Sequence, residues 1–183
     1  MDGVSRPRVE RREFKVLDEE QARLFLARAE RESPFFGVYL TAIATGMRIS
    51  EILDVRWGDV DLLARTISVR CSKTRAGVRR VDLPDVLVRW LTDRPKGAAG
   101  EPVFLRVKAN DVRRDLKRFT DIRFHDLRHS HATMGIRAGV HPKVMADRLG
   151  HSRIAVTIDT YSHVLPGMGR QVARVMDDIL GGR

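Results

Sequence analysis

The sequence predicts an α+β fold that is mainly α-helical, with one small antiparallel β-hairpin or sheet near residues 66–82. Apolar residues recur every three or four positions through most of the chain. Strict alternation of apolar and polar residues is confined to segments 66–70 and 78–82. With 183 residues, the chain is long enough to bury one hydrophobic core. We therefore expect a single domain over residues 14–183, preceded by a flexible, arginine-rich tail or linker stub at residues 1–13.

The chain carries a large excess of positive charge. Lysine and arginine total 34 against 24 acidic residues, which gives a formal net charge of +10 and a pI of about 10.7. Nucleic acid is the commonest polyanionic partner of such a chain. The sequence has neither a run of roughly 18 apolar residues nor an N-terminal signal core, so we expect a cytoplasmic protein with no membrane contact. The single cysteine, Cys71, excludes an internal disulfide and a Cys-rich zinc site.

The N-terminal half is predicted to begin with helices separated by short turns. Asp18 followed by Gln21 predicts a helix N-cap, and a second helix is expected from about Pro34 to Gly46. A short helix should follow in TGMRISEILDVRWGDVD, with its apolar residues turned inward and Arg48 at its start. The alternative for Arg48 is a surface arginine that pairs with Glu51 or Asp54.

The two alternating segments predict a hairpin whose tip, SKTRAG, carries Lys73 and Arg75. These cations are either solvated or placed to reach a bound phosphate. A helix is expected over residues 84–92, a loop over residues 94–100 and a short extended piece over residues 101–105. Asn110 is expected to cap the next helix. The outward face of that helix is basic and is either a solvated surface or a reader of a DNA groove; it carries Arg113, Arg114 and Lys117.

The stretch from His125 to Tyr161 concentrates the residues that can carry chemistry. We expect one helix from Asp126 to Gly139, a second from His141-Pro142 to Gly150 and a third capped by Ser152. Short helices with glycine turns are also typical of a helix-turn-helix DNA reader. Two further alternatives are a zinc site and purely structural histidines, and both concern His125, His129 and His131. The joint occurrence of histidines, an arginine and a tyrosine favours a functional site.

Four segments of the chain resemble the catalytic boxes of the tyrosine recombinases, the phage integrase family. They are TGMRISEIL (45–53), HDLRHSHAT (125–133), LGHS (149–152) and TIDTYSH (157–163), in the family's order. The resemblance runs from Leu17 onward and implies the catalytic-domain fold of that family. YSHVLPGM (161–168) looks most like integrases of phages and of conjugative or transposable elements. The helical DNA-clamping domain that usually precedes the catalytic domain is expected to be absent from this chain.

The resemblance also implies a role for individual residues. Tyr161 would be the nucleophile, with Arg48, Arg128 and His151 around the scissile phosphate. His125 would be the second histidine of the pocket, and Lys73 would be the general acid. The activity implied is cleavage and rejoining of double-stranded DNA through a 3′-phosphotyrosyl intermediate, without metal, nucleotide or other cofactor. Relaxation of supercoils by a type IB topoisomerase-like enzyme and a non-catalytic helix-turn-helix regulator remain alternatives.

The same resemblance implies an assembly of four protomers on DNA, with a monomer possible in isolation. The final helix, expected over residues 169–180, either packs on its own domain or docks on a neighbouring protomer. A DNA-binding chain of this kind should associate with the nucleoid.

The implied residue types suit the chemistry. Attack on a phosphodiester adds negative charge to its non-bridging oxygens, so stabilisation of charge is the main requirement. A guanidinium stays protonated and donates two parallel hydrogen bonds to phosphate. A tyrosine, with an ordinary pKa of about 10, needs a proton acceptor or nearby positive charge to attack near neutral pH.

Overall fold

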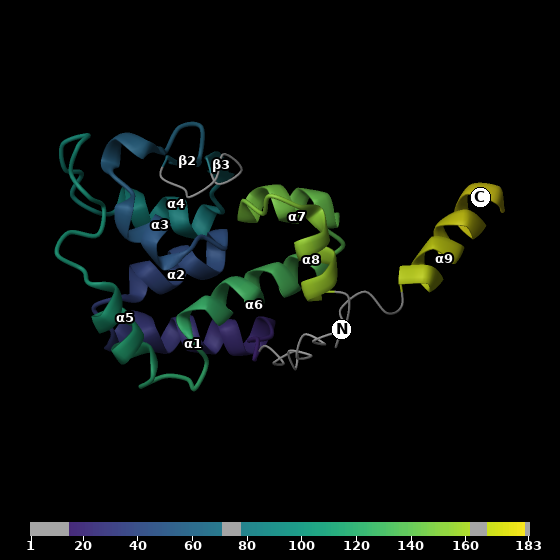
Figure 1. Ribbon diagram of the computed structural model, residues 1–183, viewed down its shortest axis with the longest axis horizontal. Coiled ribbons are helices and arrows are strands. Elements are labelled where there is room, and N and C mark those ends of the chain that lie inside the picture. The colour runs from purple at the N-terminus through teal and green to yellow at the C-terminus, as the bar shows by residue number, and fades with distance from the viewer. Residues whose placement is uncertain (1–14, 71–77, 162–167, 182–183) are drawn as a thin grey trace, which may run out of the picture.

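The computed structural model describes residues 15–70, 78–161 and 168–181, and these form a mainly helical protein with one small sheet (Figure 1). The fold class predicted from the sequence is therefore confirmed. The elements follow one another as α1 (Glu19–Glu32), α2 (Phe36–Thr45), α3 (Ile49–Asp54), the 3-10 turn η1 (Trp57–Asp59), β1 (Val60–Asp61), β2 (Thr66–Val69), β3 (Arg79–Asp82), α4 (Asp85–Thr92), α5 (Ala109–Leu116), α6 (Phe124–Arg137), α7 (Pro142–Leu149), α8 (Ile154–Tyr161) and α9 (Met168–Leu180).

Helix α2 lies at the centre of the main core. Its residues from Gly37 to Ile43 are all buried, because α1, α4 and α6 pack around it. A helix that is apolar on every side can be stable only in such a position. It ends at Gly46, whose positive φ of 68° favours glycine. A side chain there would also meet His131 and Leu149, each with an atom 2.7 Å from an added Cβ. This turn thus brings α2, α6 and α7 together.

The sheet is antiparallel with strand order β1-β2-β3. Ile67 of β2 lies opposite Val81 of β3, and both side chains are buried against the main core. This alternation is the period that predicted the two longer strands. Strand β1, only two residues long, was not predicted from the sequence because it is too short to show a period.

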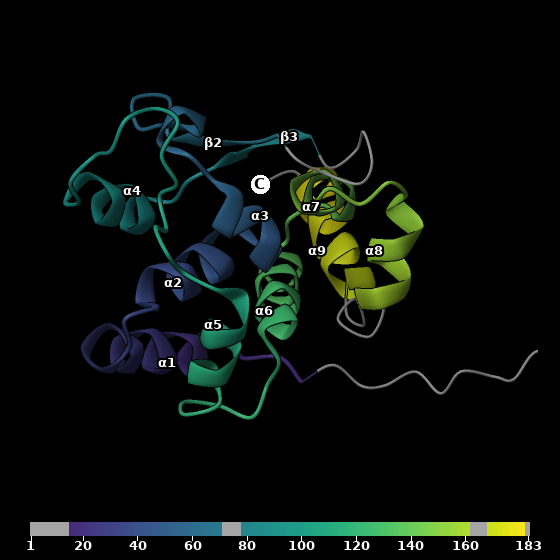
Figure 2. The ribbon, with the colours of Figure 1, turned by 60° about the vertical axis from the view of Figure 1, so that its left-hand side comes forward.

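Helix α6 links the main core to a second, smaller one. It packs against α2 on one side and α7 on the other, and Figure 2 shows it between them. The smaller core contains Ala132 and Ile136 of α6, Met145 and Leu149 of α7, and Tyr161 at the end of α8. The two cores place the ends of α2, α6, α7 and α8 close together.

Several predicted boundaries need correction. Helix α5 begins at Ala109, so Asn110 lies inside its first turn, where it accepts a hydrogen bond from Arg113. Helix α6 begins two residues before Asp126, because the Asp126 carboxylate accepts a hydrogen bond from the backbone N–H of Arg123 and closes the first turn. Arg153, not Ser152, directly precedes α8.

The predicted extended piece at 101–105 is reduced to a single bridge between Pro102 and Arg56. The predicted hairpin tip and the N-terminal tail lie outside the described residues.

Helix α9 lies apart from the other helices in Figure 1. Four of its apolar side chains are exposed: Val175, Met176, Ile179 and Leu180. These four side chains do not pack on the protomer's own domain, so that alternative for the last helix is wrong for them. Among the described helices, none is long and apolar enough to cross a membrane.

Candidate active site

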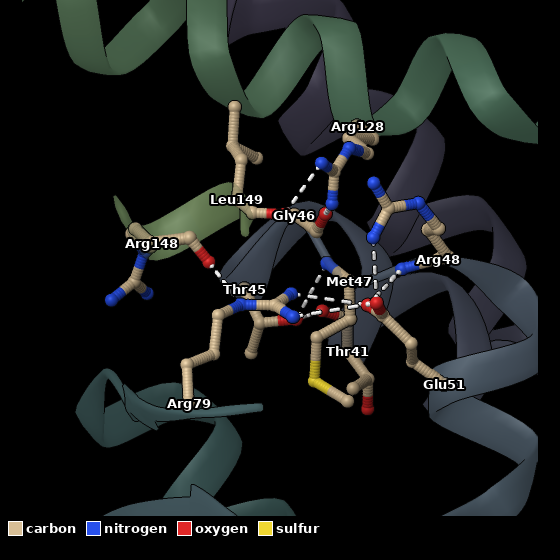
Figure 3. Close-up of polar contacts among 10 residues, drawn as sticks. All are labelled: Thr41, Thr45, Gly46, Met47, Arg48, Glu51, Arg79, Arg128, Arg148 and Leu149. Carbon is tan, nitrogen blue, oxygen red and sulfur yellow. Dashed lines mark hydrogen bonds and ion pairs between the residues drawn. The ribbon is translucent and has the colours of Figure 1, made fainter. Parts of the chain in front are cut away.

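Arg48 stands directly before α3 and is held by the first turn of that helix. The Glu51 carboxylate accepts hydrogen bonds from the backbone N–H of Arg48 at 2.9 Å and from its guanidinium at 2.7 Å. Glu51 is itself buried, with its side chain 4% exposed, and forms a second ion pair with Arg79 at 3.0 Å (Figure 3). One buried carboxylate therefore fixes two guanidinium groups from different parts of the chain.

Arg79 extends this arrangement to α7. Its side chain comes from β3 and its Nε donates a hydrogen bond to the carbonyl oxygen of Arg148 at 2.7 Å. The Arg148 side chain in turn donates to the carbonyl oxygens of Ala44 and Asp82. These bonds join α2, β3 and α7 behind Arg48.

Arg128 lies on α6 and is only 3% exposed. Its guanidinium donates hydrogen bonds to the carbonyl oxygens of Gly46 at 2.8 Å and Leu149 at 2.6 Å (Figure 3). These carbonyls stand at the C-terminal ends of α2 and α7, where the helices leave acceptors unpaired and favour a positive charge. Arg128 thereby fixes the backbone two residues before Arg48 and two residues before His151.

The two arginines share one cavity of about 540 Å³. Arg48, His125 and Arg128 line it from α3 and α6, while Arg113 and Lys117 line it from α5. Arg113 and Lys117 are one helical turn apart and both are exposed. A negatively charged ligand in this cavity would meet positive charge from three helices.

Burial and neighbouring charges set the pKa values of the titratable groups around this cavity. Burial and the neighbouring Arg48 lower the pKa of Arg128 to about 9, so its guanidinium stays protonated at neutral pH. Burial alone would raise the pKa of Glu51, but hydrogen bonds from Arg79 and Arg48 more than offset it, and the pKa is lowered. Partial desolvation, followed by the charges of Arg128 and Arg48, lowers the pKa of His125. The same causes lower the pKa of His151 to about 4, so that histidine is neutral.

Tyr161 ends α8 with its side chain 2% exposed. Its hydroxyl is hydrogen-bonded to Nδ1 of His129 at 2.8 Å. Burial raises the pKa of Tyr161 to about 12, against a lowering effect of Arg128. The charge of Arg128 therefore acts on the tyrosine oxygen, and α6 carries both Arg128 and the tyrosine's hydrogen-bond partner. His151, which precedes α8, is held at 2.8 Å by Thr157 of that helix.

The structure brings together five of the six catalytic residues predicted from the sequence: Arg48, His125, Arg128, His151 and Tyr161. Lys73 and Arg75 lie outside the described residues. Of the predicted DNA-binding residues, Arg113 and Lys117 reach the cavity, whereas Arg114 does not line it and pairs with Asp111 at 3.6 Å.

The histidines have distinct surroundings. His131 is structural: its Nδ1 is 2.8 Å from the carbonyl oxygen of Ile43, and Nε2 accepts a hydrogen bond from Arg148. In the described part of the chain, no group of three or more His, Cys, Asp or Glu residues could hold a metal ion.

Sequence reasoning missed two site residues. His129 was considered only as a zinc ligand or a structural histidine, because nothing local reveals that Tyr161 returns to it. Arg79 did carry a signal, because it lies two residues from buried Val81 and so shares the inward face of β3.

Comparison with known proteins identifies the family of this chain. The sequence profile of the phage integrase family matches residues 15–167, which include both arginines and the tyrosine. The chain belongs to the phage integrase family. This family is that of the tyrosine recombinases, so the resemblance inferred from the four sequence boxes is confirmed.

Individual relatives cover most of this chain. It is 29% identical to the ICEBs1 integrase of Bacillus subtilis (strain 168) over 98% of this chain and 58% of the relative. It is 33% identical to tyrosine recombinase XerA of Saccharolobus solfataricus over 87% of this chain and 55% of the relative. The chain thus spans somewhat more than half the length of these curated relatives.

Solved structures show the same fold. The Tn1549 transposon integrase, in complex with circular intermediate DNA, superposes with a TM-score of 0.71 at 21% identity, over 91% of this chain and 68% of the other. The catalytic domain of bacteriophage HP1 integrase superposes with a TM-score of 0.67 at 22% identity, over 90% of this chain and 96% of that domain. The HP1 match shows that the described fold is that of a tyrosine recombinase catalytic domain.

Proposed function

We propose that this chain is the catalytic part of a site-specific DNA recombinase, or integrase, that cleaves and rejoins DNA strands through a phosphotyrosyl intermediate. The observation that supports it most is the convergence of Arg48 and Arg128, from distant segments, on one cavity beside the buried Tyr161. Membership of the phage integrase family supports the same reaction.

Each residue has a defined part in the proposed reaction. Arg48 and Arg128 bind the non-bridging oxygens of the scissile phosphate, and their fixed forks stabilise the charge that grows during attack. His125 and His151 donate further hydrogen bonds to that phosphate. The Tyr161 oxygen attacks phosphorus, and Lys73 protonates the departing 5′-oxygen. The phosphotyrosyl ester conserves the energy of the broken DNA bond, so rejoining needs no nucleotide.

The proposed substrate is double-stranded DNA, bound along the basic side of the cavity. Arg113 and Lys117 are placed to contact backbone phosphates next to the scissile one, since they line the same cavity as Arg48. Arg75 is a further DNA contact that we propose, and Arg114, which does not line the cavity, is a weaker one. Binding to chromosomal DNA would also associate the protein with the nucleoid.

Recombination requires two DNA sites. With two protomers on each site, the proposed active assembly contains four protomers. The exposed apolar residues of α9 supply a surface through which one protomer can dock on the next.

The reaction can be tested without knowledge of the DNA site. The protein is incubated with a library of short, nicked DNA duplexes of random sequence, denatured, and examined for DNA that stays covalently attached. We expect an adduct with the wild-type chain, or with a version joined to a relative's DNA-clamping domain, and none with Tyr161→Phe. If both wild-type forms give no adduct, the proposed function is wrong. If Tyr161→Phe gives as much adduct as wild type, the nucleophile is wrongly assigned.

A further inference from the structure

His129 contacts the atom that the proposed function assigns as the nucleophile. Its Nδ1 lies 2.8 Å from the Tyr161 hydroxyl oxygen, and its ring is tilted against the tyrosine ring at a centroid distance of 5.9 Å. The same imidazole meets His125 edge-on, with ring centroids 4.9 Å apart. His129 therefore lies between the nucleophile and a histidine that lines the phosphate cavity.

The protonation states of both groups allow a hydrogen bond in which the phenol donates to the imidazole. Burial, followed by the neighbouring His125, lowers the pKa of His129 to about 4, so the imidazole is neutral near pH 7. Burial keeps Tyr161 protonated, because its pKa is raised to about 12. A neutral imidazole can accept at one ring nitrogen while the other carries the proton. In the tautomer that carries its proton on Nε2, Nδ1 accepts the phenol hydrogen bond, and this is the arrangement that a proton transfer to this nitrogen needs.

We propose that His129 is a further catalytic residue of this site, the base that accepts the Tyr161 proton as the tyrosine oxygen attacks phosphorus. The inference rests on the proposed function. In the step, the bond between the Tyr161 oxygen and phosphorus forms, and the bond from phosphorus to the 5′-oxygen breaks. The tyrosine proton moves to Nδ1 of His129, and the 5′-oxygen takes a proton from the general acid. Rejoining returns both protons.

The chemistry of the attack makes a weak base sufficient. As the phosphorus–oxygen bond forms, the tyrosine oxygen loses its affinity for a proton, so transfer becomes favourable during the attack. A bound phosphodiester also counters the positive charge of Arg128, one of the causes that lower the pKa of His129. Among the described residues, the charged and titratable groups around His129 include His125, Asp126, Arg128 and Arg123 of α6 and its first turn, His151 before α8, and Tyr161 itself.

Two substitutions separate proton transfer from mere positioning. In His129→Asn, the side-chain oxygen can accept the tyrosine hydrogen bond but cannot take the proton, whereas His129→Phe removes both functions. The measurement is the rate of covalent adduct formation on a nicked duplex recovered from the library with wild-type protein. We expect both variants to be slower by about 100-fold, the usual contribution of a general base. Thermal melting should show that His129→Asn is folded.

Two further readouts move only if His129 acts as a base. The wild-type rate should fall as the pH drops towards the range where His129 is protonated, and this fall should be absent in His129→Asn. A duplex with sulfur in place of the 5′-bridging oxygen needs no general acid. This duplex should restore the rate of adduct formation by Lys73→Ala but leave the rate for His129→Asn slow.

Each outcome decides between alternatives. If His129→Asn cleaves at the wild-type rate while His129→Phe does not, His129 only positions the tyrosine and the proposal is wrong. It is also wrong if His125→Asn, but not His129→Asn, abolishes the acidic fall in rate, because His125 would then be the base. Absence of an adduct with wild-type protein would instead contradict the proposed function itself.

Discussion

In this protein one buried carboxylate, that of Glu51, pairs with two guanidinium groups. Glu51 neutralises Arg79, which is only 7% exposed at its side chain, and holds Arg48, which faces the cavity. Taking a carboxylate out of water is costly, and two guanidinium partners offset that cost. The sequence suggested Glu51 as a surface partner of Arg48, since the three-residue spacing is visible. The second partner could be found only when β3 was placed beside α3.

Glu51→Ala is expected to destabilise the protein by about 3 kcal/mol or more, because it removes the buried carboxylate that pairs with the buried guanidinium of Arg79. Chemical unfolding measures this change. The matched control is Asp147→Ala, which removes an exposed pair with Lys143 and should cost about 0.5 kcal/mol or less. Equal effects of the two substitutions would contradict a structural role for the Glu51 pair.

At the scale of elements, several helix ends meet around side chains that α6 contributes. Arg128 is held by the C-terminal ends of α2 and α7, Arg48 precedes α3, and Tyr161 ends α8. Helix ends carry unpaired backbone groups, so a charged side chain can be bound there without a carboxylate. Helix α5 differs, because it contributes a face. Its buried Asp115 accepts hydrogen bonds from Tyr39 and Ser33, which leaves Arg113 and Lys117 turned outward.

Lys117 and Arg114 have different surroundings in the structure, although both were predicted from the sequence as DNA contacts. Lys117→Ala should weaken DNA binding and reduce the slope of log affinity against log salt concentration by about 0.9, the value for one lost phosphate contact. Arg114→Ala is the matched control from the same helix, and we expect a smaller change because Arg114 does not line the cavity. Binding titrations at several salt concentrations measure both. A larger slope change for Arg114→Ala would mean that the DNA follows another face of α5.

At the scale of the whole molecule, the proposed nucleophile belongs to its own protomer's core. Tyr161 packs with Ala132, Ile136, Met145 and Leu149 of the same chain. Delivery of this tyrosine to a neighbouring site would require the loss of that packing and of the hydrogen bond to His129. For the proposed reaction, we therefore expect Tyr161 to cleave the phosphate held by its own arginines.

Mixing two inactive variants tests delivery within one protomer. Arg48→Ala keeps the tyrosine but loses an arginine, at an expected cost of about 100-fold to 1000-fold in rate. Tyr161→Phe keeps both arginines but has no nucleophile. We expect a mixture of the two to form no more covalent adduct than Arg48→Ala alone. Adduct restored towards the wild-type level would show that Tyr161 acts on a neighbour's site.

Acid should destabilise the folded protein. The folded-state pKa of His131 is lowered to about 4 by burial, followed by Arg148, and the pKa of His151 is likewise about 4. Unfolded histidines have a pKa of about 6.5, so the unfolded state binds more protons between these values. This contribution to stability is present above about pH 6.5 and is lost as the pH falls towards about 4.

Thermal melting at pH 7 and pH 5 measures the effect, and we expect a lower melting temperature at pH 5. In His131→Asn the difference between the two pH values should shrink, because one titrating group is removed. An unchanged difference would mean that His131 does not contribute to the acid sensitivity.

The sequence by itself determined the elements and most of the chemistry. Helical periodicity, the glycine turns at Gly46 and Gly150, and the alternation in β2 and β3 are local properties, so the fold class followed from them. The resemblance carried by four short boxes supplied the family, and it supplied the roles of Arg48, Arg128 and Tyr161 as predictions. Helix starts at Asn110 and Asp126 were misplaced, because capping depends on side-chain geometry that spacing only suggests.

The tertiary structure alone decided how these residues meet. Nothing local links Arg79 to Glu51 or His129 to Tyr161, since each contact joins segments about 30 residues apart through packing of separate elements. Backbone carbonyl oxygens hold Arg128, so the types of the residues that supply them do not reveal the contact. Burial, which sets the protonation of Tyr161 and its histidine, is likewise a property of the assembled cores, because it depends on every element packed around them.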